Sequence, residues 1–445
     1  MNAAIRDGRN SGTGGLGEKK GGLGEKEGGG ETRRAPGVAD LAGWLECIGV
    51  EHPKTVVRGV GHVAEVASRA GLNPPAPVNF VVAGTNGKGS TAVFLERLLM
   101  ASGRTVGTTL SPHLLRFNER IRVDGREVED EEIVAAFEVV EAARQDVALT
   151  YFEYAILAAF GVFRDRKVDA SVLEVGLGGR LDAVNVVDAD VAIITSIGLE
   201  HQDYLGPDVE AIGAEKAGVM RRGRPAVFGA RDMPNSVRAR AAELDAHLVV
   251  NGVDYRHAID SGGWVVNLFD GRRVRVGERP RVAADNAAAA VQALAMIEPD
   301  FDTAALAEAC RVATIPGRLE RVDARGRRWI LDVAHNPHAA GFLRENLEGP
   351  IAVAILGMLK DKAHAGVARA LAGRVERWVV TDNTASRGLR AAELGKRLPV
   401  RHAREPRIRD AIAYAVSTTE ANDVILVLGS FDTVARARQE LIRAK

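Results

Sequence analysis

The spacing of apolar and polar positions divides the chain into short continuous apolar runs and longer segments of helical period. Continuous runs predict buried strands at residues 78–83, 105–108, 170–175, 191–197 and 226–228. Apolar residues recur at helical spacing between several of these runs, as at 131–144 and 152–164. Apolar strands that alternate with helices indicate a parallel sheet covered on both faces. We therefore expect an α/β domain over residues 36–315.

The same alternation begins again after Pro316 and Gly317, a pair that favours a hinge. Strands are predicted at residues 329–333, 351–355, 378–381 and 424–428, and helices at 338–347, 362–372, 391–397, 408–416 and 430–443. This pattern indicates a second, smaller α/β domain of Rossmann-like type over residues 316–445. Residues 247–283 differ, since short β-prone pieces with glycine-rich turns predict a small antiparallel patch there.

The first 35 residues do not share this pattern. They are rich in glycine and charge, and the hexamer Gly-Gly-Leu-Gly-Glu-Lys occurs at Gly14 and again at Gly21. Such a segment cannot bury enough apolar surface to offset its ordering entropy, so we expect a disordered tail over residues 1–35. The fold is expected to begin near Pro36, where Leu41, Trp44, Leu45 and Ile48 recur at helical spacing.

Composition narrows the class of protein further. The 445 residues include 59 Lys and Arg and 59 Asp and Glu, so no net charge favours nucleic acid or an anionic membrane as a partner. The two cysteines lie far apart without metal-ligand spacing, which suits a reducing compartment. No apolar stretch reaches membrane-spanning length and no signal peptide is evident, so we expect a cytoplasmic protein.

A glycine-rich segment directly after the first predicted strand is the most informative motif. It reads Gly84-Thr85-Asn86-Gly87-Lys88-Gly89-Ser90, and helical spacing follows over residues 91–101. Strand, glycine-rich turn and helix N-terminus form a cradle for phosphate, to which a lysine adds a full positive charge. Gly89 stands where a strict Walker A motif has Ser or Thr. An ordinary glycine-rich turn is the alternative, but the lysine and its flanks favour a nucleotide phosphate site in a P-loop-type domain.

Polar residues follow the other strands of this domain. Ligands bind outside the carboxyl ends of parallel strands, so these residues sample the site. Segments 110–113, 174–180 and 198–203 bring Ser111, Glu174 and His201 to this edge. A surface carboxylate and a structural histidine are the alternatives for the last two. Because both follow strand ends beside a phosphate loop, we interpret them as magnesium ligands.

Several longer motifs resemble the folylpolyglutamate synthase/dihydrofolate synthase family of Mur-type amide ligases, and most closely its bacterial bifunctional members. They lie at residues 84–90, 110–113, 149–154, 174–183, 201–206, 215–219, 331–338 and 428–431. The resemblance runs from about residue 38 to the C-terminus. It implies an ATP-binding domain followed by a glutamate-ligase domain.

The resemblance also implies roles for individual residues. ATP would be bound by Thr85, Asn86, Gly87, Lys88, Gly89, Ser90, Asn286, Arg318 and Asp332. Two magnesium ions would be held by Ser111, Glu174, His201 and Lys216, the last as a carbamylated lysine. Folate would contact Thr55, Thr150, Tyr151, Phe152, Glu153, Leu181, Asp182 and Ala183, and the incoming glutamate would contact His335 and Ser430. Lys88, Lys216 and His201 would act in catalysis.

The implied reaction joins L-glutamate to dihydropteroate or a reduced folate through an acyl phosphate, with ATP and Mg²⁺. We expect a monomer whose partners are these small molecules. A monofunctional folylpolyglutamate synthase, another Mur ligase and a nucleotide-binding regulatory protein are the alternatives. A peptidoglycan Mur ligase needs a UDP-recognition domain before the loop, whereas only residues 37–83 are available there.

The chain departs from the family pattern at three points. Val184 stands where the family usually has threonine, and Val57 where it commonly has aspartate. Residues 283–285 read Ala-Ala-Asp before Asn286, instead of a pattern that ends in glutamine. The two valines remove polar groups near the expected pterin site, so unequal use of the two acceptors is expected.

Overall fold

The computed structural model describes residues 40–50 and 59–442. The expected tail over residues 1–35 lies outside this range, as do Thr55 and Val57. The chain within it begins with α1 (Leu41–Val50), which confirms the helix expected there. Leu41, Trp44 and Ile48 are buried, as their helical spacing predicts.

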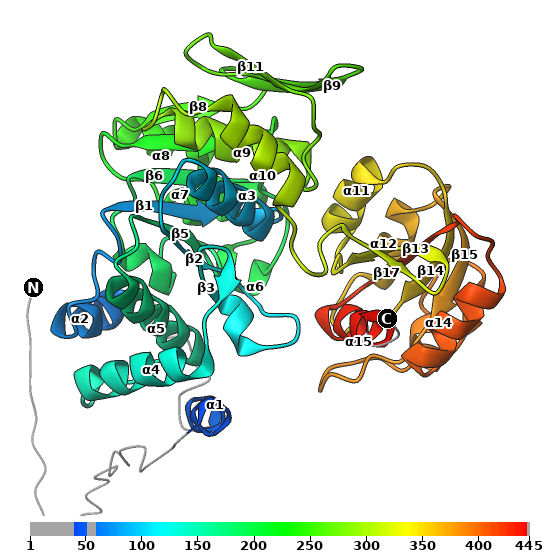
Figure 1. Cartoon of the computed structure of the whole chain (residues 1–445). Helices are drawn as coiled ribbons and strands as arrows, with labels where there is room; N and C mark the ends of the chain where they lie inside the picture. The colour runs from blue at the N-terminus through cyan, green and yellow to red at the C-terminus, as the bar shows by residue number, and fades with distance from the viewer. Residues whose placement is uncertain (1–39, 51–58, 443–445) are drawn as a thin grey trace, which may run out of the picture. The chain divides into compact units, whose positions relative to one another are not determined.

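The first large sheet has eight strands in the order β4-β3-β2-β5-β1-β6-β7-β8 (Figure 1). Their bounds are β1 (Val78–Ala83), β2 (Val106–Thr109), β3 (Ile121–Val123), β4 (Arg126–Glu127), β5 (Ala170–Glu174), β6 (Val191–Ile194), β7 (Pro225–Phe228) and β8 (His247–Val250). The six strands from β2 to β8 are parallel, which confirms the predicted sheet. The antiparallel β3–β4 hairpin at one edge was not predicted.

Helices cover both faces of this sheet. On one side α3 (Lys88–Ala101), α9 (Ala284–Ala295) and α10 (Thr303–Val312) pack together over Phe80, Val82 and their neighbours. The other side carries α5 (Tyr151–Arg166), whose Phe163 lies against Gly107. Because successive strand residues point to opposite faces, Val106 and Gly107 meet different helices. The remaining helices of this part are α2 (Gly61–Arg69), α4 (Asp130–Arg144), α6 (Gln202–Leu205), α7 (Val209–Ala217) and α8 (Asn235–Glu243).

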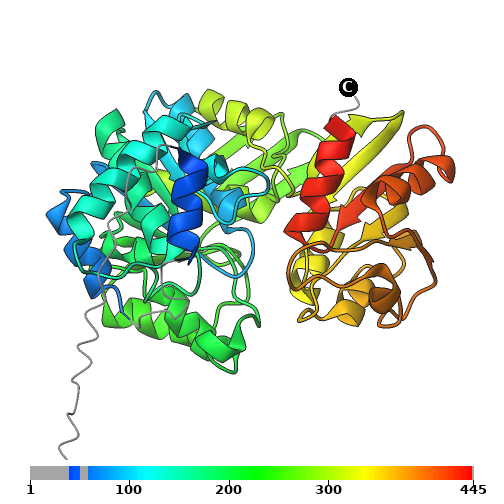
Figure 2. The same ribbon diagram turned by 90° about the horizontal axis from the view of Figure 1, so that it is seen from below.

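Figure 2 shows α1, in dark blue, against the helices that follow the hairpin. It packs on α4 and α5, where the Trp44 and Phe137 rings lie 5.7 Å apart. Helix α1 therefore extends the helical layer that covers this face of the sheet.

A separate three-stranded antiparallel sheet has the order β11-β10-β9, formed by β9 (Arg256–Asp260), β10 (Gly263–Asn267) and β11 (Arg273–Val276). It confirms the antiparallel patch in part. Residues 247–250 were wrongly included, because they form β8 and pair in parallel with β7. Trp264 anchors this small sheet, since its fully buried ring meets Phe94 of α3 edge-on with centroids 6.1 Å apart.

Trp264→Ala should destabilise the fold by about 3–5 kcal/mol, because it removes a large buried ring and leaves a cavity. Chemical unfolding measures this loss. Ile259→Ala is the matched control, since Ile259 lies opposite Trp264 on β9 but is 45% exposed. Equal losses in the two variants would contradict an anchoring role for the ring.

The second large sheet has six strands in the order β12-β13-β17-β14-β15-β16. Their bounds are β12 (Glu320–Ala324), β13 (Arg327–Asp332), β14 (Ile351–Leu356), β15 (Val375–Val380), β16 (His402–Arg404) and β17 (Val424–Leu428). The four predicted strands are confirmed and run parallel. The two edge strands were not predicted: β12 pairs antiparallel with β13, and β16 is a three-residue parallel strand.

The second sheet is also covered on both faces. One face packs on α11 (Pro337–Asn346), α12 (His364–Ala370) and α13 (Ala391–Gly395) through Leu356, Leu426 and Leu428. The other packs on α14 (Ile408–Ser417) and α15 (Phe431–Ile442), the red helix of Figure 2, through Ile355 and Val427. Alternate residues of each strand feed the two cores, as in the first sheet.

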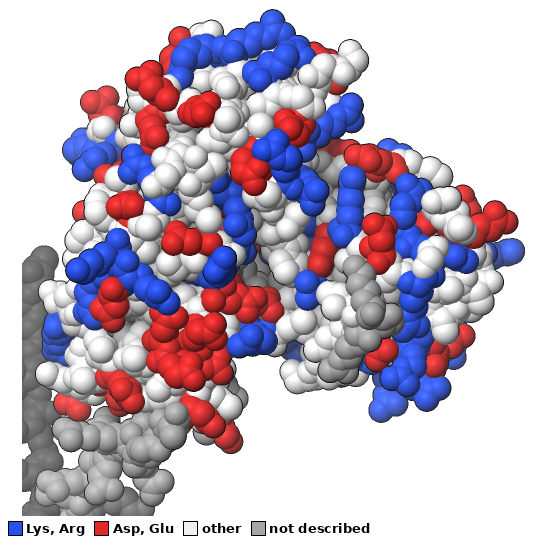
Figure 3. Space-filling model, in the orientation of Figure 1, with Lys and Arg blue, Asp and Glu red and all other residues white. Residues whose placement is uncertain are grey.

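Within the described ranges no helix is long and apolar enough to span a membrane. Charges of both signs are interspersed over the face in Figure 3. A row of basic side chains runs along its upper edge. Arg256 of β9 and Arg273 and Arg275 of β11 are exposed.

Candidate nucleotide and ligation site

The glycine-rich segment forms the turn between β1 and α3. The helix begins at Lys88, earlier than predicted, and its first internal bond runs from Thr91 N to Gly87 O. The three preceding amides therefore have no partner within the helix and lie at its positive end, which favours an anion. Gly87 has a φ of +91°, a conformation that glycine adopts without strain. This geometry suits the predicted phosphate site.

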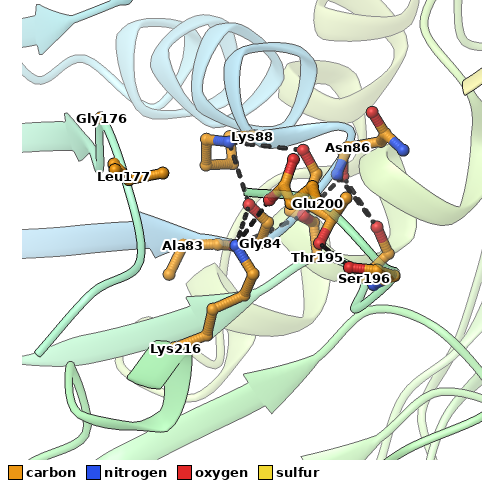
Figure 4. Close-up of polar contacts among 12 residues, drawn as sticks. Ala83, Gly84, Asn86, Lys88, Gly176, Leu177, Thr195, Ser196, Glu200 and Lys216 are labelled. Carbon is orange, nitrogen blue, oxygen red and sulfur yellow. Dashed lines mark hydrogen bonds and ion pairs between the residues drawn. The ribbon is translucent and has the colours of Figure 1, made fainter. Parts of the chain in front are cut away.

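Two side chains at the end of β6 hold this loop (Figure 4). Thr195 Oγ1 donates to Asn86 O at 2.7 Å, and Ser196 Oγ accepts from Asn86 N at 3.2 Å. Gly84 lies so close to Thr195 that a Cβ there would be 1.9 Å from its hydroxyl oxygen. Neither anchor was predicted from the sequence. Both lie inside the strand predicted over residues 191–197, whereas β6 ends at Ile194, and their hydroxyl groups at the carboxyl end of that segment were the available signal.

Lys88 and Lys216 both point toward the carbonyl of Gly84 (Figure 4). Lys88 Nζ donates to Gly84 O at 2.9 Å and Lys216 Nζ at 3.0 Å. Lys216 comes from the last turn of α7 and is 1% exposed, and it also pairs with Glu200 at 2.9 Å. Burial lowers the pKa of Lys216 to about 8, against the opposing effect of Glu200. The two predicted lysines therefore donate to the same carbonyl oxygen. Glu200 was not assigned a role from the sequence.

Glu174 is the buried carboxylate of the site. It ends β5, and its Oε2 accepts from Ser111 N at 2.7 Å. Its oxygens lie 3.5 Å from the position a Cβ would take on Gly89. Burial raises the pKa of Glu174, with Lys88 and Arg318 opposing it. No ion pair within 4 Å neutralises it among the described residues, so this carboxylate fits a bound cation.

His201 differs from the other predicted metal ligands in its exposure and contacts. It is exposed and precedes α6 with a φ of +45°. Its neighbour Glu200, and not His201 itself, makes the contact with Lys216. The described part of the chain contains no cluster of three or more His, Cys, Asp and Glu that could hold a metal. A magnesium site here would therefore depend on the mixed set of Ser111, Glu174, His201 and a modified Lys216.

Two cavities bring further predicted residues together. One of about 370 Å³ is lined by Gly89, Ser111, Glu174 and Arg318, together with Phe431. A smaller one of about 50 Å³ is lined by Asn86, Gly87 and Ser90 of the loop, by Arg318 just before β12, and by Asp332 and His335 of the β13–α11 segment. Arg318 therefore borders both.

Asn286, near the start of α9, lies against the loop. A Cβ on Gly87 would be 2.3 Å from its side-chain oxygen, and its Nδ2 is buried without a hydrogen-bond partner. A buried amide nitrogen without an acceptor is costly, so it suits contact with a ligand. The preceding Asp285, one of the departures, accepts from His257 Nε2 at 2.8 Å and Asn251 Nδ2 at 2.7 Å.

The predicted folate residues of α5 also have local roles. Thr150 caps the helix by accepting from Glu153 N, and Glu153 Oε2 accepts from Thr150 N at 2.6 Å. Glu153 also pairs with His62 at 2.9 Å. The Phe152 ring lies against Gly176, directly beyond Glu174, where a Cβ would be 2.6 Å away. Contact between these residues and folate stays a prediction.

Asp182 holds the backbone of the second predicted folate segment, residues 181–183, in place. Its carboxylate accepts from the amides of Gly176, Leu177 and Val184 at 2.9–3.0 Å, and burial raises its pKa to about 6. It fixes the turn after β5, which Leu181 and Ala183 flank. The hydroxyl that threonine would carry at position 184 would be buried here, since Val184 is fully buried.

The two predicted glutamate ligands differ in setting. His335 lines the smaller cavity beside nucleotide candidates, and its Nδ1 lies 2.9 Å from Val333 O. Ser430 is buried, accepts from Asn383 Nδ2 at 2.6 Å and donates to Thr433 at 2.9 Å. Its neighbour Phe431, rather than Ser430, lines the larger cavity. A glutamate contact for either residue stays a prediction.

Comparison with known proteins decides the family. Residues 82–262 match the Mur ligase middle domain, and residues 317–431 match the Mur ligase glutamate ligase domain. The dihydrofolate synthase/folylpolyglutamate synthase of Escherichia coli K12 is 41% identical over 93% of this chain and 98% of its own length. This chain belongs to the dihydrofolate synthase/folylpolyglutamate synthase family. It is an ATP-dependent ligase, which confirms the resemblance and the class of enzyme predicted.

Solved structures agree with this ligase in fold. E. coli FolC in complex with DHPP and ADP matches with a TM-score of 0.86 at 40% identity, over 92% of this chain and 99% of that one. The bifunctional folylpolyglutamate synthase/dihydrofolate synthase of Yersinia pestis, complexed with AMPPNP and Mn ion, gives the same TM-score and coverage at 41% identity. The predicted order of two α/β units is thereby confirmed.

Proposed function

We propose that this ligase joins L-glutamate to dihydropteroate, forming dihydrofolate, and to the γ-carboxyl of reduced folates, forming folylpolyglutamates. The observation that carries the proposal is the meeting of Glu174 with the start of α3, where a buried carboxylate faces the phosphate loop at Gly89. This arrangement suits a metal-bound nucleotide phosphate. Relatives that match nearly the whole chain carry both activities in their names.

In the proposed reaction the acceptor carboxylate attacks the γ-phosphorus, and the bond to the ADP oxygen breaks with its electron pair left on ADP. The glutamate amine then attacks the acyl carbon, loses a proton and expels phosphate. Lys88 and the free amides of α3 bind the phosphates and oppose the charge that develops on them. Closure of the second domain over the first would exclude water.

We assign Ser111, Glu174, His201 and a carbamylated Lys216 to two magnesium ions. The buried carboxylate of Glu174 suits a cation, and the lowered pKa of Lys216 suits capture of CO₂ by its neutral amine. Bound magnesium would neutralise phosphate charge during transfer. The chain's own groups hold the nucleotide and orient the acceptor.

Steady-state ADP release with glutamate and each acceptor tests the proposal. We expect turnover with both dihydropteroate and tetrahydrofolate, at unequal efficiency. A substrate polar group without its partner costs about 1–3 kcal/mol, which corresponds to roughly ten- to a hundredfold. Val184 and Val57 are the residues expected to cause this difference. Turnover with tetrahydrofolate alone would make the protein a monofunctional folylpolyglutamate synthase, and turnover with neither would reject the proposal.

A further inference from the structure

Arg120 differs from Arg116 and Arg122 in its ion pairing. It ends the short 3-10 helix Phe117–Arg120, between β2 and β3. Arg116 pairs with Asp130 at 3.3 Å, and Arg122 pairs with the buried Glu96 at 2.9 Å. Arg120 has no ion pair within 4 Å among the described residues, although it is half-buried.

Its guanidinium is held in one orientation by neutral groups. Nε donates to His113 Nδ1 at 2.8 Å, and the guanidinium carbon lies 5.8 Å and 5.6 Å from the ring centroids of Phe117 and Tyr151. The two terminal nitrogens have no protein acceptor in the described structure. The carboxylate of the adjacent Glu119 is occupied, because it accepts from the amides of residues 114, 115 and 116. Arg120 therefore presents oriented donors without an anion.

The surroundings indicate which anion fits. Glu174 is near enough for Arg120 to lower its pKa, yet the two form no ion pair within 4 Å. Tyr151, over whose ring the guanidinium lies, is the first residue of α5 and precedes Phe152, whose ring packs beside the turn after Glu174. Arg120 thus contacts the predicted folate segment through Tyr151 and is near the carboxylate that faces the phosphate loop. A planar guanidinium matches a carboxylate in shape and charge.

We propose that Arg120 binds the carboxylate of the acceptor and holds it for attack on the γ-phosphate. This inference rests on the proposed function. The aromatic contacts and His113 fix the guanidinium, so little side-chain freedom is lost when the carboxylate binds. Arg120 would keep contact with the carboxyl group as it becomes the acyl phosphate. It is therefore a binding residue for the acceptor and not for the nucleotide.

The test compares binding of dihydropteroate and of its carboxamide, in the presence of ADP and Mg²⁺, by calorimetry. The wild-type protein should prefer the acid by roughly 10- to 100-fold, the range for hydrogen bonds to a charged group. Arg120→Gln should abolish this preference by weakening the acid alone, and Arg120→Lys should keep part of it. Arg116→Gln is the matched control, since that exposed arginine belongs to the same segment and should leave the preference unchanged.

Three outcomes would overturn the inference: equal weakening of acid and amide in Arg120→Gln, no preference in the wild-type protein, or a raised KM for ATP with unchanged acceptor binding. The last would assign Arg120 to a nucleotide phosphate. If dihydropteroate is not a substrate, tetrahydrofolate and its γ-carboxamide replace the pair. Wild-type turnover of neither acceptor rejects the proposed function, whereas turnover without the Arg120 pattern rejects only this inference.

Discussion

Lys216→Ala should lower ligation by roughly 10²–10³-fold, the scale seen when one preorganised polar contact to the transition state is lost. The expected loss follows from the environment of the Lys216 amine. Lys216 is almost fully buried, its pKa is about 8, and its Nζ lies 3.0 Å from the carbonyl at the start of the phosphate loop. At pH 7.5 a pKa of about 8 leaves about a quarter of the amine neutral, against about 0.1% at the ordinary value of 10.5. Only the neutral amine captures CO₂, so this environment favours a carbamate.

Rescue of the Lys216→Ala variant by an added carboxylate distinguishes a carbamylated Lys216 from a lysine with a purely structural role. A short carboxylate such as acetate should partly restore Lys216→Ala, because it can occupy the place of the carbamate oxygens, and it should not affect the wild-type protein. Lys216→Met fills the buried volume without an amine and should be as inactive as the alanine variant, which excludes a cavity as the cause. Full activity of unmodified wild-type protein in CO₂-free buffer, with the intact mass of a free lysine, would refute the carbamate.

Lys88→Ala should reduce ADP release by a similar factor while the protein remains folded. Among the described residues, Lys88 Nζ donates only to the carbonyls of Gly84 and Thr85, and it stands at the N-terminus of α3 where a phosphate would lie. Its removal takes away a charge aimed at phosphate, but opens no apolar cavity. Those two carbonyls can accept from water instead.

The Lys88 experiment needs saturating ATP and a thermal unfolding curve. Lys396→Ala is the matched control, because Lys396 is exposed at the end of α13 in the second domain, far along the chain from the loop. We expect both variants to unfold near the wild-type temperature, with activity lost only in Lys88→Ala. Wild-type turnover in Lys88→Ala would remove the loop from the ATP site. Early unfolding of Lys88→Ala would instead give the lysine a structural role.

The sequence by itself determined the central strands of both large sheets and the phosphate loop. The segment from Val78 to Ala83 could be identified as a strand because it is a nearly continuous apolar run, and β1 has these bounds. Gly84, Gly87 and Lys88 stand next to one another along the chain, so their juxtaposition needs no knowledge of the fold. The family motifs also identified Lys216 and Glu174, although not the contacts these residues make.

The edge strands could not be predicted from the local pattern of apolar residues. β12 and the β3–β4 hairpin are short and partly exposed, so no continuous apolar run marks them. The segment 247–250 resembled the antiparallel pieces that follow it, but pairing with β7 placed it in the large sheet. Pairing partners depend on where the other strands lie, which short segments do not encode.

Only the tertiary structure determined which residues contact one another at the site. Thr195 and Ser196 hold a loop more than a hundred residues earlier, because β6 lies beside β1 in the sheet. Lys216 meets Gly84 across 132 residues, and this burial, which the sequence does not display, lowers its pKa. Arg120 lacks an ion-pair partner among the described residues, although several carboxylates are close to it in sequence. Contacts and burial arise from packing of distant segments, whereas spacing along the chain determines the local turn that cradles phosphate.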